Sequence, residues 1–377
     1  MLIIRKYLKG DGVIWAVILF LSLFSLLAVY SSTGTLAYKY KGGNTLYYFL
    51  RHSSYLVFGL GVIFILHHIP YKIYSRLSQF LLYIIVPLLG FTLFMGTNRN
   101  EASRWLTLPG LEITIQTSDF AKLILIMYVA RLLSLKQQNI KDYKTAFRPI
   151  IISVIVVCGL ILPANLSTAV ILFATSIILM FIGRVSLKQI GILTGIGVIG
   201  FASFLILAKY IEFDGRIGTW QNRIESFMTG DEEENFQVEQ SKIAIATGGV
   251  FGKGPGNSTQ RNFLPHPYSD FIYAIIIEEY GILGGVTILF LYLYLFYRAG
   301  VIVRRCDRTF PAFLAIGLAI SLVFQAMVNM AVAVNLFPVT GQTLPLVSMG
   351  GSSILFSSMA LGIILSISRY TKKEKTT

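Results

Sequence analysis

Long apolar runs alternate with short polar breaks along nearly the whole chain. Ten of these runs approach the roughly 20 residues that an α-helix needs to cross the hydrocarbon core of a bilayer. The predicted helices lie near residues 13–30, 50–67, 77–95, 117–135, 149–163, 166–183, 189–209, 270–297, 309–335 and 350–370. The pattern therefore predicts an all-α polytopic membrane protein with about ten transmembrane helices.

The distribution of basic residues predicts the orientation of these helices. An even number of spans places both termini on one side, and most of the 32 Lys and Arg residues fall into the termini and connections of that side. The short connections of the other side hold few of them: Lys39, Lys41, Arg51, Arg99 and Arg104. Because cytoplasmic loops are enriched in Lys and Arg, both termini are predicted to be cytoplasmic.

The longest connection, about residues 210–269, is then a large extracytoplasmic loop. Residues 216–227 and 237–246 within it have helical spacing, and the acidic run 231–234 is predicted to be a solvated tip. Loops of this length are usually either functional or disordered. A second outer connection, residues 96–116, is polar and has a turn predicted at Pro109-Gly110.

A further polar segment, residues 335–353, faces the same predicted outer side. Its Pro and Gly residues cannot all lie in a regular helix: Pro338, Gly341, Pro345, Gly350 and Gly351. Irregular backbone at membrane depth is tolerated only where it is buried in protein or lines a cavity. This segment is therefore a candidate wall of a polar site.

Composition narrows the class further. Hydrophobic residues make up 55% of the chain and charged residues 13%, against about 25% charged in soluble domains. The net charge of +14 is explained by topology and anionic lipid, with no pattern that indicates nucleic-acid binding. Neither a disulfide framework nor a Cys/His metal site is predicted from the two cysteines and four histidines: Cys158, Cys306, His52, His67, His68 and His266.

Asp270 stands at the predicted start of the eighth helix, directly after a Gly-rich segment. A carboxylate at the water–lipid boundary can accept a proton from a hydroxyl group. Ionisable groups in membrane segments are costly and by default mark functional sites. The alternative is structural, because Asp is a favoured N-cap residue, and both interpretations remain open.

Glu278 and Glu279 lie deeper in the same predicted helix. They either belong to the polar site or form a buried ion pair, for which Lys122 is the natural cation. Asp119 and Lys122 are three residues apart and are predicted to share one helical face.

The basic residues nearest the predicted outer polar surface are Arg104, Lys122, Lys253 and Arg261. Cations combined with Gly-rich backbone amides suit a phosphate, although residues 252–258 lack the context of a nucleotide-binding P-loop. Two classes remain: an enzyme acting on an anionic, lipid-linked substrate, or a transporter or flippase with a carboxylate proton relay. Both irregular polar segments lie in the C-terminal half, which favours the enzyme over a transporter with paired broken helices.

Four stretches carry a resemblance to a known family. They are SRWLTLPGLEITIQTSDFAKL (103–123), NLSTAVIL (165–172), GKGPGNSTQRNFLPHPYSDFIYAIIIEEYGILG (252–284) and NLFPVTGQTLPLVSMGGSS (335–353). In this order the chain resembles, over most of its length, the SEDS family (shape, elongation, division and sporulation) of bacterial cell-wall proteins. The GxGNSxQ pattern at Gly254–Gln260 is most similar to the division branch.

The resemblance implies a single SEDS-type transmembrane domain, residues 1–377, in the bacterial plasma membrane at the division septum. It implies a peptidoglycan glycosyltransferase that polymerises lipid II on the outer face, with Asp270, at the family's essential aspartate, as general base. The donor would be a glycan on undecaprenyl diphosphate. The implied partners are a class B penicillin-binding protein, which is a monofunctional transpeptidase, and other division proteins. A lipid II flippase and an elongation-type polymerase are the alternatives.

The resemblance also implies a set of substrate contacts: Arg104, Trp105, Asp119, Lys122, Lys253, Asn257, Gln260, Arg261, Glu278, Ser348 and Ser352. Cations among them would steady the departing diphosphate, with a divalent cation, Mg²⁺ or Mn²⁺, as an open alternative and no metal ligand assigned. The groove is predicted between Asp270, residues 103–123 and residues 335–353. Asp119 stands where Glu is common, and His266-Pro267-Tyr268 replaces the usual Glu-Ala-His, which puts in doubt any role for these three residues.

Overall fold

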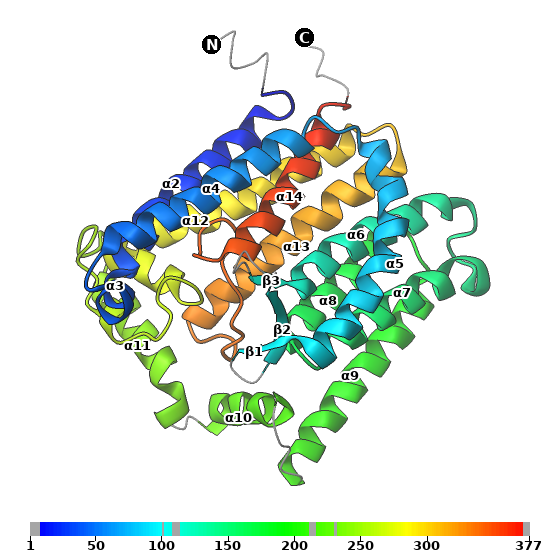
Figure 1. The fold of residues 1–377 in the computed structure, drawn as a ribbon. Coiled ribbons are helices and arrows are strands. Elements are labelled where there is room, and N and C mark those ends of the chain that lie inside the picture. The colour runs from blue at the N-terminus through cyan, green and yellow to red at the C-terminus, as the bar shows by residue number, and fades with distance from the viewer. Residues whose placement is uncertain (1–7, 100–101, 108–113, 211–215, 230–231, 372–377) are drawn as a thin grey trace. The chain divides into compact units, whose positions relative to one another are not determined.

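The computed structural model of the chain describes residues 8–99, 102–107, 114–210, 216–229 and 232–371. Helices dominate these residues (Figure 1). The α-helices are α2 (Gly12–Ser32), α3 (Gly34–Lys41), α4 (Thr45–Leu66), α5 (Tyr71–Met95), α6 (Thr117–Leu135), α7 (Arg148–Ile161), α8 (Leu166–Ile182), α9 (Leu187–Tyr210), α10 (Arg216–Thr229), α11 (Glu232–Gly248), α12 (Ile272–Arg304), α13 (Thr309–Ala333) and α14 (Gly351–Ser368).

Every predicted membrane run coincides with one of these helices. By length and composition, 7 helices of the described chain can cross a membrane: α2, α4, α5, α12, α13, α14 and the helix Tyr143–Ile161 that contains α7. The apolar helices Leu166–Ile182 and Leu187–Ser203 are shorter, and α6 carries Asp119, Lys122 and Arg131. The all-helical polytopic membrane architecture is confirmed, and the count of ten spans stays a prediction.

The long connection before α12 is largely helical. The two stretches with helical spacing form α10 and α11, as predicted. Within the acidic run 231–234, Asp231 lies outside the described residues and residues 232–234 form the first turn of α11, so these three are helical. Their exposure to solvent stays a prediction.

The connection between α5 and α6 contains a small antiparallel sheet, in the order β1 (Thr97–Arg99), β2 (Ala102–Thr107), β3 (Thr114–Gln116). The polar composition predicted a connection here but no strands. Trp105 in β2 pairs with Gln116 in β3. The turn predicted at Pro109-Gly110 lies outside the described residues.

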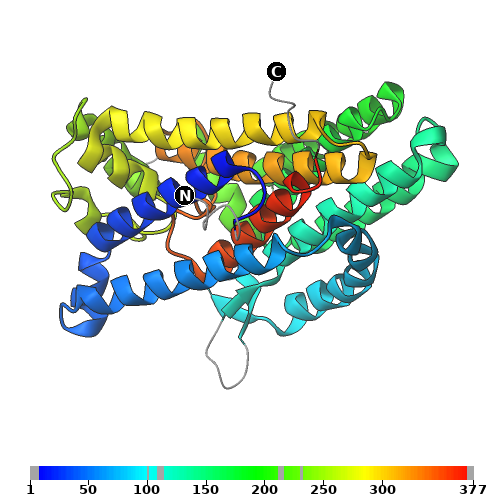
Figure 2. The same ribbon diagram turned by 90° about the horizontal axis from the view of Figure 1, so that it is seen from above.

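The chain divides into two compact units whose segments alternate in the sequence. Unit 1 holds residues 1–68, 223–298 and 322–365, and unit 2 holds residues 69–222, 299–321 and 366–377. In unit 1, α2 packs along α4 (Figures 1 and 2). Asp11 accepts hydrogen bonds from the backbone of Val13 and Ile14 at the start of α2 and pairs with Arg298 at 2.5 Å.

In unit 2, α6 packs against α5, α7 and α8. Hydrogen bonds place three connections predicted to be cytoplasmic at one end of this unit. The connections are α6–α7, α8–α9 and α12–α13. The hydrogen bonds join Ser134 and Thr309 at 2.6 Å, Gln137 Nε2 and the Gly183 carbonyl at 3.4 Å, and Gln189 Nε2 and the Lys141 carbonyl at 3.2 Å. The grouping agrees with the predicted topology, and the side of the membrane that this end faces stays a prediction.

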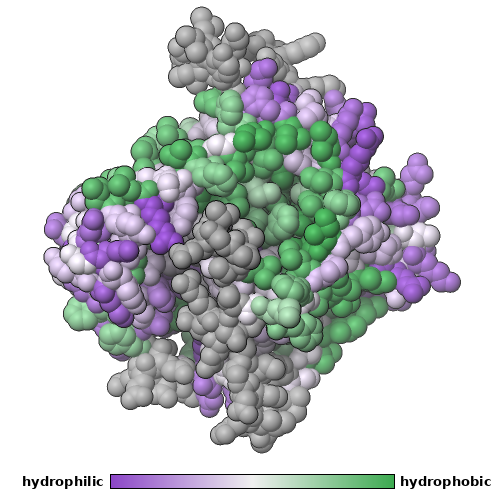
Figure 3. All heavy atoms as spheres, viewed as in Figure 1, coloured by the Kyte–Doolittle hydropathy of each residue, from purple (hydrophilic) through white to green (hydrophobic). Residues whose placement is uncertain are grey.

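Large apolar side chains are exposed on the helices, and they include Leu19 (56%) and Phe20 (52%) on α2. Figure 3 shows apolar surface over the helical faces and hydrophilic surface at connections between helices. A lipid environment explains this exposure. Apolar side chains are stable against hydrocarbon, and a helix pairs its backbone polar groups internally.

Candidate functional site around Asp270

Asp270 lies in the turn directly before α12 and is half-buried. The hydroxyl of Ser269 donates to Asp270 Oδ1 at 2.8 Å. Asp270 Oδ2 faces Gly341, where an added Cβ would lie 3.6 Å from it. The helix begins at Ile272, so Phe271 and not Asp270 occupies the N-cap position.

A small apolar core fixes the start of this helix. Phe271 packs with Leu264, Ile275 and Val332, and its carbonyl accepts hydrogen bonds from the Ala274 and Ile275 amides at 3.0 and 3.4 Å. Burial of such side chains is worth about 1.5–3 kcal/mol each. The residue next to Asp270 in the chain is therefore an anchor for its backbone.

The segment 335–353 folds directly onto the Asp270 turn. Asn329 Nδ2 at the end of α13 donates both to the Asp270 carbonyl at 2.8 Å and to the Gln342 carbonyl at 2.7 Å. Ser348 Oγ donates to the Ser269 carbonyl at 2.6 Å, and the Met349 amide donates to the Tyr268 carbonyl at 2.8 Å. The predicted proximity of the two polar segments is confirmed. That they form a substrate groove together with residues 103–123 stays a prediction.

Helix α12 is broken, which the apolar sequence did not predict. Gly281 has φ 69° and ψ −175°, which is not helical. The Ile282 amide bonds to the Gly249 carbonyl at 2.9 Å, while the carbonyls of Glu278 and Glu279 accept from the Lys253 and Gly254 amides at 2.9 Å. The Gly-rich turn, residues 248–261, thus supplies the hydrogen-bonding partners that the helix itself lacks at the break.

Three glycines permit this close approach of backbones. A Cβ at Gly248 would collide with the Ile277 carbonyl, one at Gly252 with the Glu279 carbonyl and one at Gly281 with the Val250 carbonyl. Gly252 and Gly281 also have positive φ, a conformation that favours glycine. The glycines of this segment serve backbone packing against α12.

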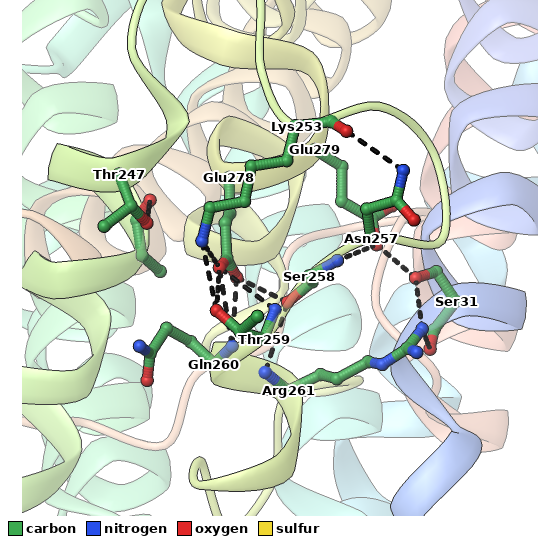
Figure 4. A network of polar contacts seen from close by, with 11 residues as sticks. Ser31, Thr247, Lys253, Asn257, Ser258, Thr259, Gln260, Arg261, Glu278 and Glu279 are labelled. Carbon is green, nitrogen blue, oxygen red and sulfur yellow. Dashed lines mark hydrogen bonds and ion pairs between the residues drawn. The ribbon is translucent and has the colours of Figure 1, made fainter.

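Glu278 is fully buried at the centre of a polar network (Figure 4). Lys253 Nζ pairs with it at 2.6 Å. Ser258 Oγ donates at 2.5 Å, and the Thr259 amide and hydroxyl donate at 3.1 and 2.9 Å. The predicted pairing of Lys122 with Glu278 or Glu279 is wrong. The Gly-rich turn brings Lys253 to Glu278, and Lys122 pairs with Asp119 at 3.2 Å.

Glu279 forms the second half of this network. It accepts hydrogen bonds from the Ser31 hydroxyl and from the Ser258 amide, the latter at 3.3 Å. Arg261 Nη1 donates to the carbonyl and hydroxyl of Ser31 at 3.0 and 3.2 Å. Figure 4 shows Arg261 reaching along the network toward Ser31 in α2. The two glutamates therefore join α2, the Gly-rich turn and α12.

The predicted substrate residues fall into separate groups. Lys253, Gln260, Arg261 and Glu278 belong to the network, and Asn257 Nδ2 donates to the Lys253 carbonyl at 3.0 Å. Ser348 lies at the Asp270 turn, and Ser352 is buried in the first turn of α14. In unit 2, Asp119 and Lys122 open α6, Trp105 is half-buried on β2, and the Arg104 side chain lies outside the described part of the structure.

The sequence reasoning missed several residues that contact the Asp270 turn or the two glutamates: Ser31, Ser258, Thr259, Ser269 and Asn329. A polar residue within an apolar run was the available signal for Ser31 and Asn329. Within the described residues there is no group of three or more His, Cys, Asp or Glu side chains that could hold a metal ion. A divalent cation held together with the substrate diphosphate stays a prediction.

Fold and site together define a polytopic membrane protein in which two irregular polar segments converge on one aspartate. The chain belongs to the FtsW/RodA/SpoVE family, described as cell cycle proteins, which it matches over residues 11–373. It is 32% identical to stage V sporulation protein E of Bacillus subtilis over 97% of this chain and 99% of that protein. It is 33% identical to the probable peptidoglycan glycosyltransferase FtsW of Trichlorobacter lovleyi over 95% of this chain and 93% of that protein.

Two solved structures share the fold. One concerns the coordination of polymerization and crosslinking by a peptidoglycan synthase complex, with a TM-score of 0.72 and 23% identity, covering 97% of this chain and all of that chain. The other is the rod shape determining protein RodA of Thermus thermophilus, with a TM-score of 0.69, 23% identity and the same coverage. At these identities the likeness concerns the fold alone.

Proposed function

We propose that the protein is a peptidoglycan glycosyltransferase that polymerises lipid II on the outer face of the plasma membrane, with Asp270 as general base. The observation that carries the proposal is the meeting of the two irregular polar segments at the turn that carries Asp270: Ser348 donates to the Ser269 carbonyl, and Gly341 lies beside Asp270 Oδ2. Membership of the family and relatives named as probable peptidoglycan glycosyltransferases support the reaction class.

The chemistry asks Asp270 to remove one proton. Its carboxylate accepts the proton of the acceptor sugar hydroxyl as that oxygen bonds to the anomeric carbon of the donor glycan. The bond from that carbon to the diphosphate breaks at the same centre, and undecaprenyl diphosphate leaves with the electron pair. The Ser269 hydroxyl, which donates to Oδ1, orients the carboxylate, and Gly341 leaves space beside Oδ2.

The polar network around Glu278 and Glu279 bears on which basic residues can bind the leaving diphosphate. The head groups of Lys253 and Arg261 serve the internal contacts of Glu278 and Ser31. We therefore assign to Lys253 and Arg261 the task of holding the Gly-rich turn. Diphosphate binding by Arg104 and by Lys122, which pairs with Asp119, rests on the family resemblance. Charge-assisted contacts to phosphate are among the stronger hydrogen bonds in proteins.

The biological setting is proposed to be septal wall synthesis with a class B penicillin-binding protein as partner. The relatives reported above include a stage V sporulation protein E and a probable peptidoglycan glycosyltransferase FtsW. The fold of a chain from a peptidoglycan synthase complex supports a partnered enzyme. The alternative is a role in cell elongation. Localisation of the protein in cells, at the septum or along the side wall, would distinguish the two roles.

The test compares glycan-strand formation from lipid II by the wild type and by Asp270→Asn, each purified with the partner. The amide keeps the shape of the carboxylate but cannot accept the proton, so the rate should fall by about 10²–10⁴ with membrane level and partner binding unchanged. Glu239→Gln, an exposed substitution on α11, should keep full activity. Full activity of Asp270→Asn would remove Asp270 from the mechanism. An inactive wild type that moves lipid II across vesicle membranes would indicate a flippase.

A further inference from the structure

A strained turn, residues 344–349, lies next to the Asp270 segment. Leu346 has φ 62°, a left-handed conformation that is unfavourable for a residue with a Cβ. The amides of Val347 and Ser348 both bond to the Leu344 carbonyl, at 3.1 and 2.9 Å. Strain of this kind persists only where the surrounding structure over-determines the backbone. Contacts from other parts of the fold must therefore hold this turn.

Two side chains from other helices hold the carbonyls of this turn. Tyr292 of α12 donates its hydroxyl to the Pro345 carbonyl at 2.5 Å. Ser25 of α2 donates its hydroxyl to the Val347 carbonyl at 2.8 Å. Both side chains are buried, and so are Leu346 and Val347, so water cannot replace either hydrogen bond without opening the core.

A histidine completes the second of these contacts. His52 of α4 is fully buried, and its Nε2 lies 2.7 Å from Ser25 Oγ. A serine hydroxyl has one proton, and the Ser25 proton is directed to the Val347 carbonyl. His52 Nε2 must therefore be the donor, which fixes the neutral ring in the Nε2–H tautomer.

The turn passes this constraint to the Asp270 segment. Ser348 Oγ accepts from the Leu344 amide at 2.8 Å and donates to the Ser269 carbonyl at 2.6 Å. Ser269 in turn donates its hydroxyl to Asp270 Oδ1. A path of hydrogen bonds and intervening covalent bonds of the chain thus runs from His52 through Ser25 and the turn to Ser269, the residue that orients the carboxylate.

We propose that Ser25 and His52 are positioning residues for Asp270, which they hold through the strained turn without contacting substrate. The proposal rests on the proposed function, since it deepens the role of the same site. Without the Ser25 contact, the turn can relax at Leu346, and the Ser348 contact to Ser269 shifts with it. A displacement of about 1 Å at a reacting group can cost roughly 100-fold in rate.

Four variants test the proposal in the complex with the partner. His52→Gln retains an amide N–H donor and should keep most of the activity. His52→Phe and Ser25→Ala should each lower kcat by roughly 10- to 100-fold with KM nearly unchanged. The double variant Ser25→Ala/His52→Phe removes both buried polar groups of the pair, so its thermal stability should recover relative to Ser25→Ala while kcat stays low. His68→Phe, at the exposed end of α4, is the matched control and should behave as the wild type.

Hydrogen exchange of the peptide covering residues 343–350 gives a readout independent of polymerisation. Exchange should be faster in the double variant than in the wild type and unchanged in His68→Phe. Recovery of kcat together with stability in the double variant, or unchanged exchange, would overturn the positioning role. Faster exchange in a preparation whose wild type makes no glycan would sustain the positioning role and contradict the proposed function instead.

Discussion

Neutralising either partner of the Lys253–Glu278 ion pair should destabilise the protein, but by different amounts. The Glu278 side chain is wholly buried, whereas 28% of the Lys253 side chain is exposed. Glu278→Gln would direct an NH₂ group toward the amides of Thr259 and Gln260, which now donate to the carboxylate. We expect a loss of about 2–6 kcal/mol, because two donors lose their acceptor and each such loss costs about 1–3 kcal/mol.

Lys253→Met should cost less. The carboxylate keeps the Ser258 and Thr259 hydroxyls and the amide donors. The more exposed Thr259 hydroxyl loses its contact with Lys253 Nζ at 3.0 Å, and the carboxylate loses one charge-assisted hydrogen bond. Such a bond contributes about 1.5–3 kcal/mol. Lys242→Met and Glu239→Gln, both exposed on α11, are matched controls that should stay within about 0.5 kcal/mol of the wild type.

The double variant Lys253→Met/Glu278→Gln isolates the pair. A neutral amide needs no cation, so the combined loss should fall short of the sum by about 1–3 kcal/mol. The measurement is reversible denaturant unfolding of the purified protein in detergent. Hydrogen-bonded pairs between membrane helices average only about 0.6 kcal/mol in such cycles, so a coupling at or below that value would refute the ion-pair reasoning.

Three further results are expected. Gly281→Ala should greatly reduce the yield of folded protein because its Cβ would strike backbone, whereas Gly300→Ala, in open space on the same helix, should be tolerated; equal yields would contradict the role of the break. Burial raises the pKa of the Cys306 thiol to about 11, so the thiol stays protonated at pH 8 and should alkylate slowly, with a rate that rises up to about pH 11; fast labelling at pH 8 would contradict this. In a cysteine-free background, Pro255→Cys should react with an impermeant thiol reagent from outside and Lys141→Cys only after lysis, since both positions are exposed, and the reverse pattern would invert the topology.

Hydrophobic periodicity was sufficient to predict the membrane helices, because the length of an apolar run is set by the bilayer itself. It could not predict the break at Gly281, because the glutamates before this glycine and the apolar residues after it are equally compatible with an unbroken helix. The break depends on a backbone partner, Gly249, that lies far away in the chain. A glycine within a helical run was the only local sign of it.

The same limit applies to the charges. Lys122 was a reasonable partner for the glutamates because it is a cation within a predicted membrane helix, near the predicted outer polar surface. The actual partner, Lys253, comes from a loop that folds back onto α12. Which cation reaches a buried carboxylate is decided by that loop path, which depends on three glycines that tolerate backbone contact. The prediction for Asp270, by contrast, rests on its expected position at the water–lipid boundary, which does not depend on such a path.

The Gly-rich turn resembled a phosphate-binding loop by composition, but its hydrogen bonds are directed inward. The amides of Lys253 and Gly254 bond to carbonyls of α12, and those of Thr259 and Gln260 bond to Glu278. A phosphate would have to displace a fully buried carboxylate to use the last two donors, and leaving that charge unpaired is costly. The turn is therefore better understood as the brace that lets α12 break at Gly281 and begin again. It fixes the helical segment that follows Asp270, while the segment 335–353 fixes the turn that carries the carboxylate itself.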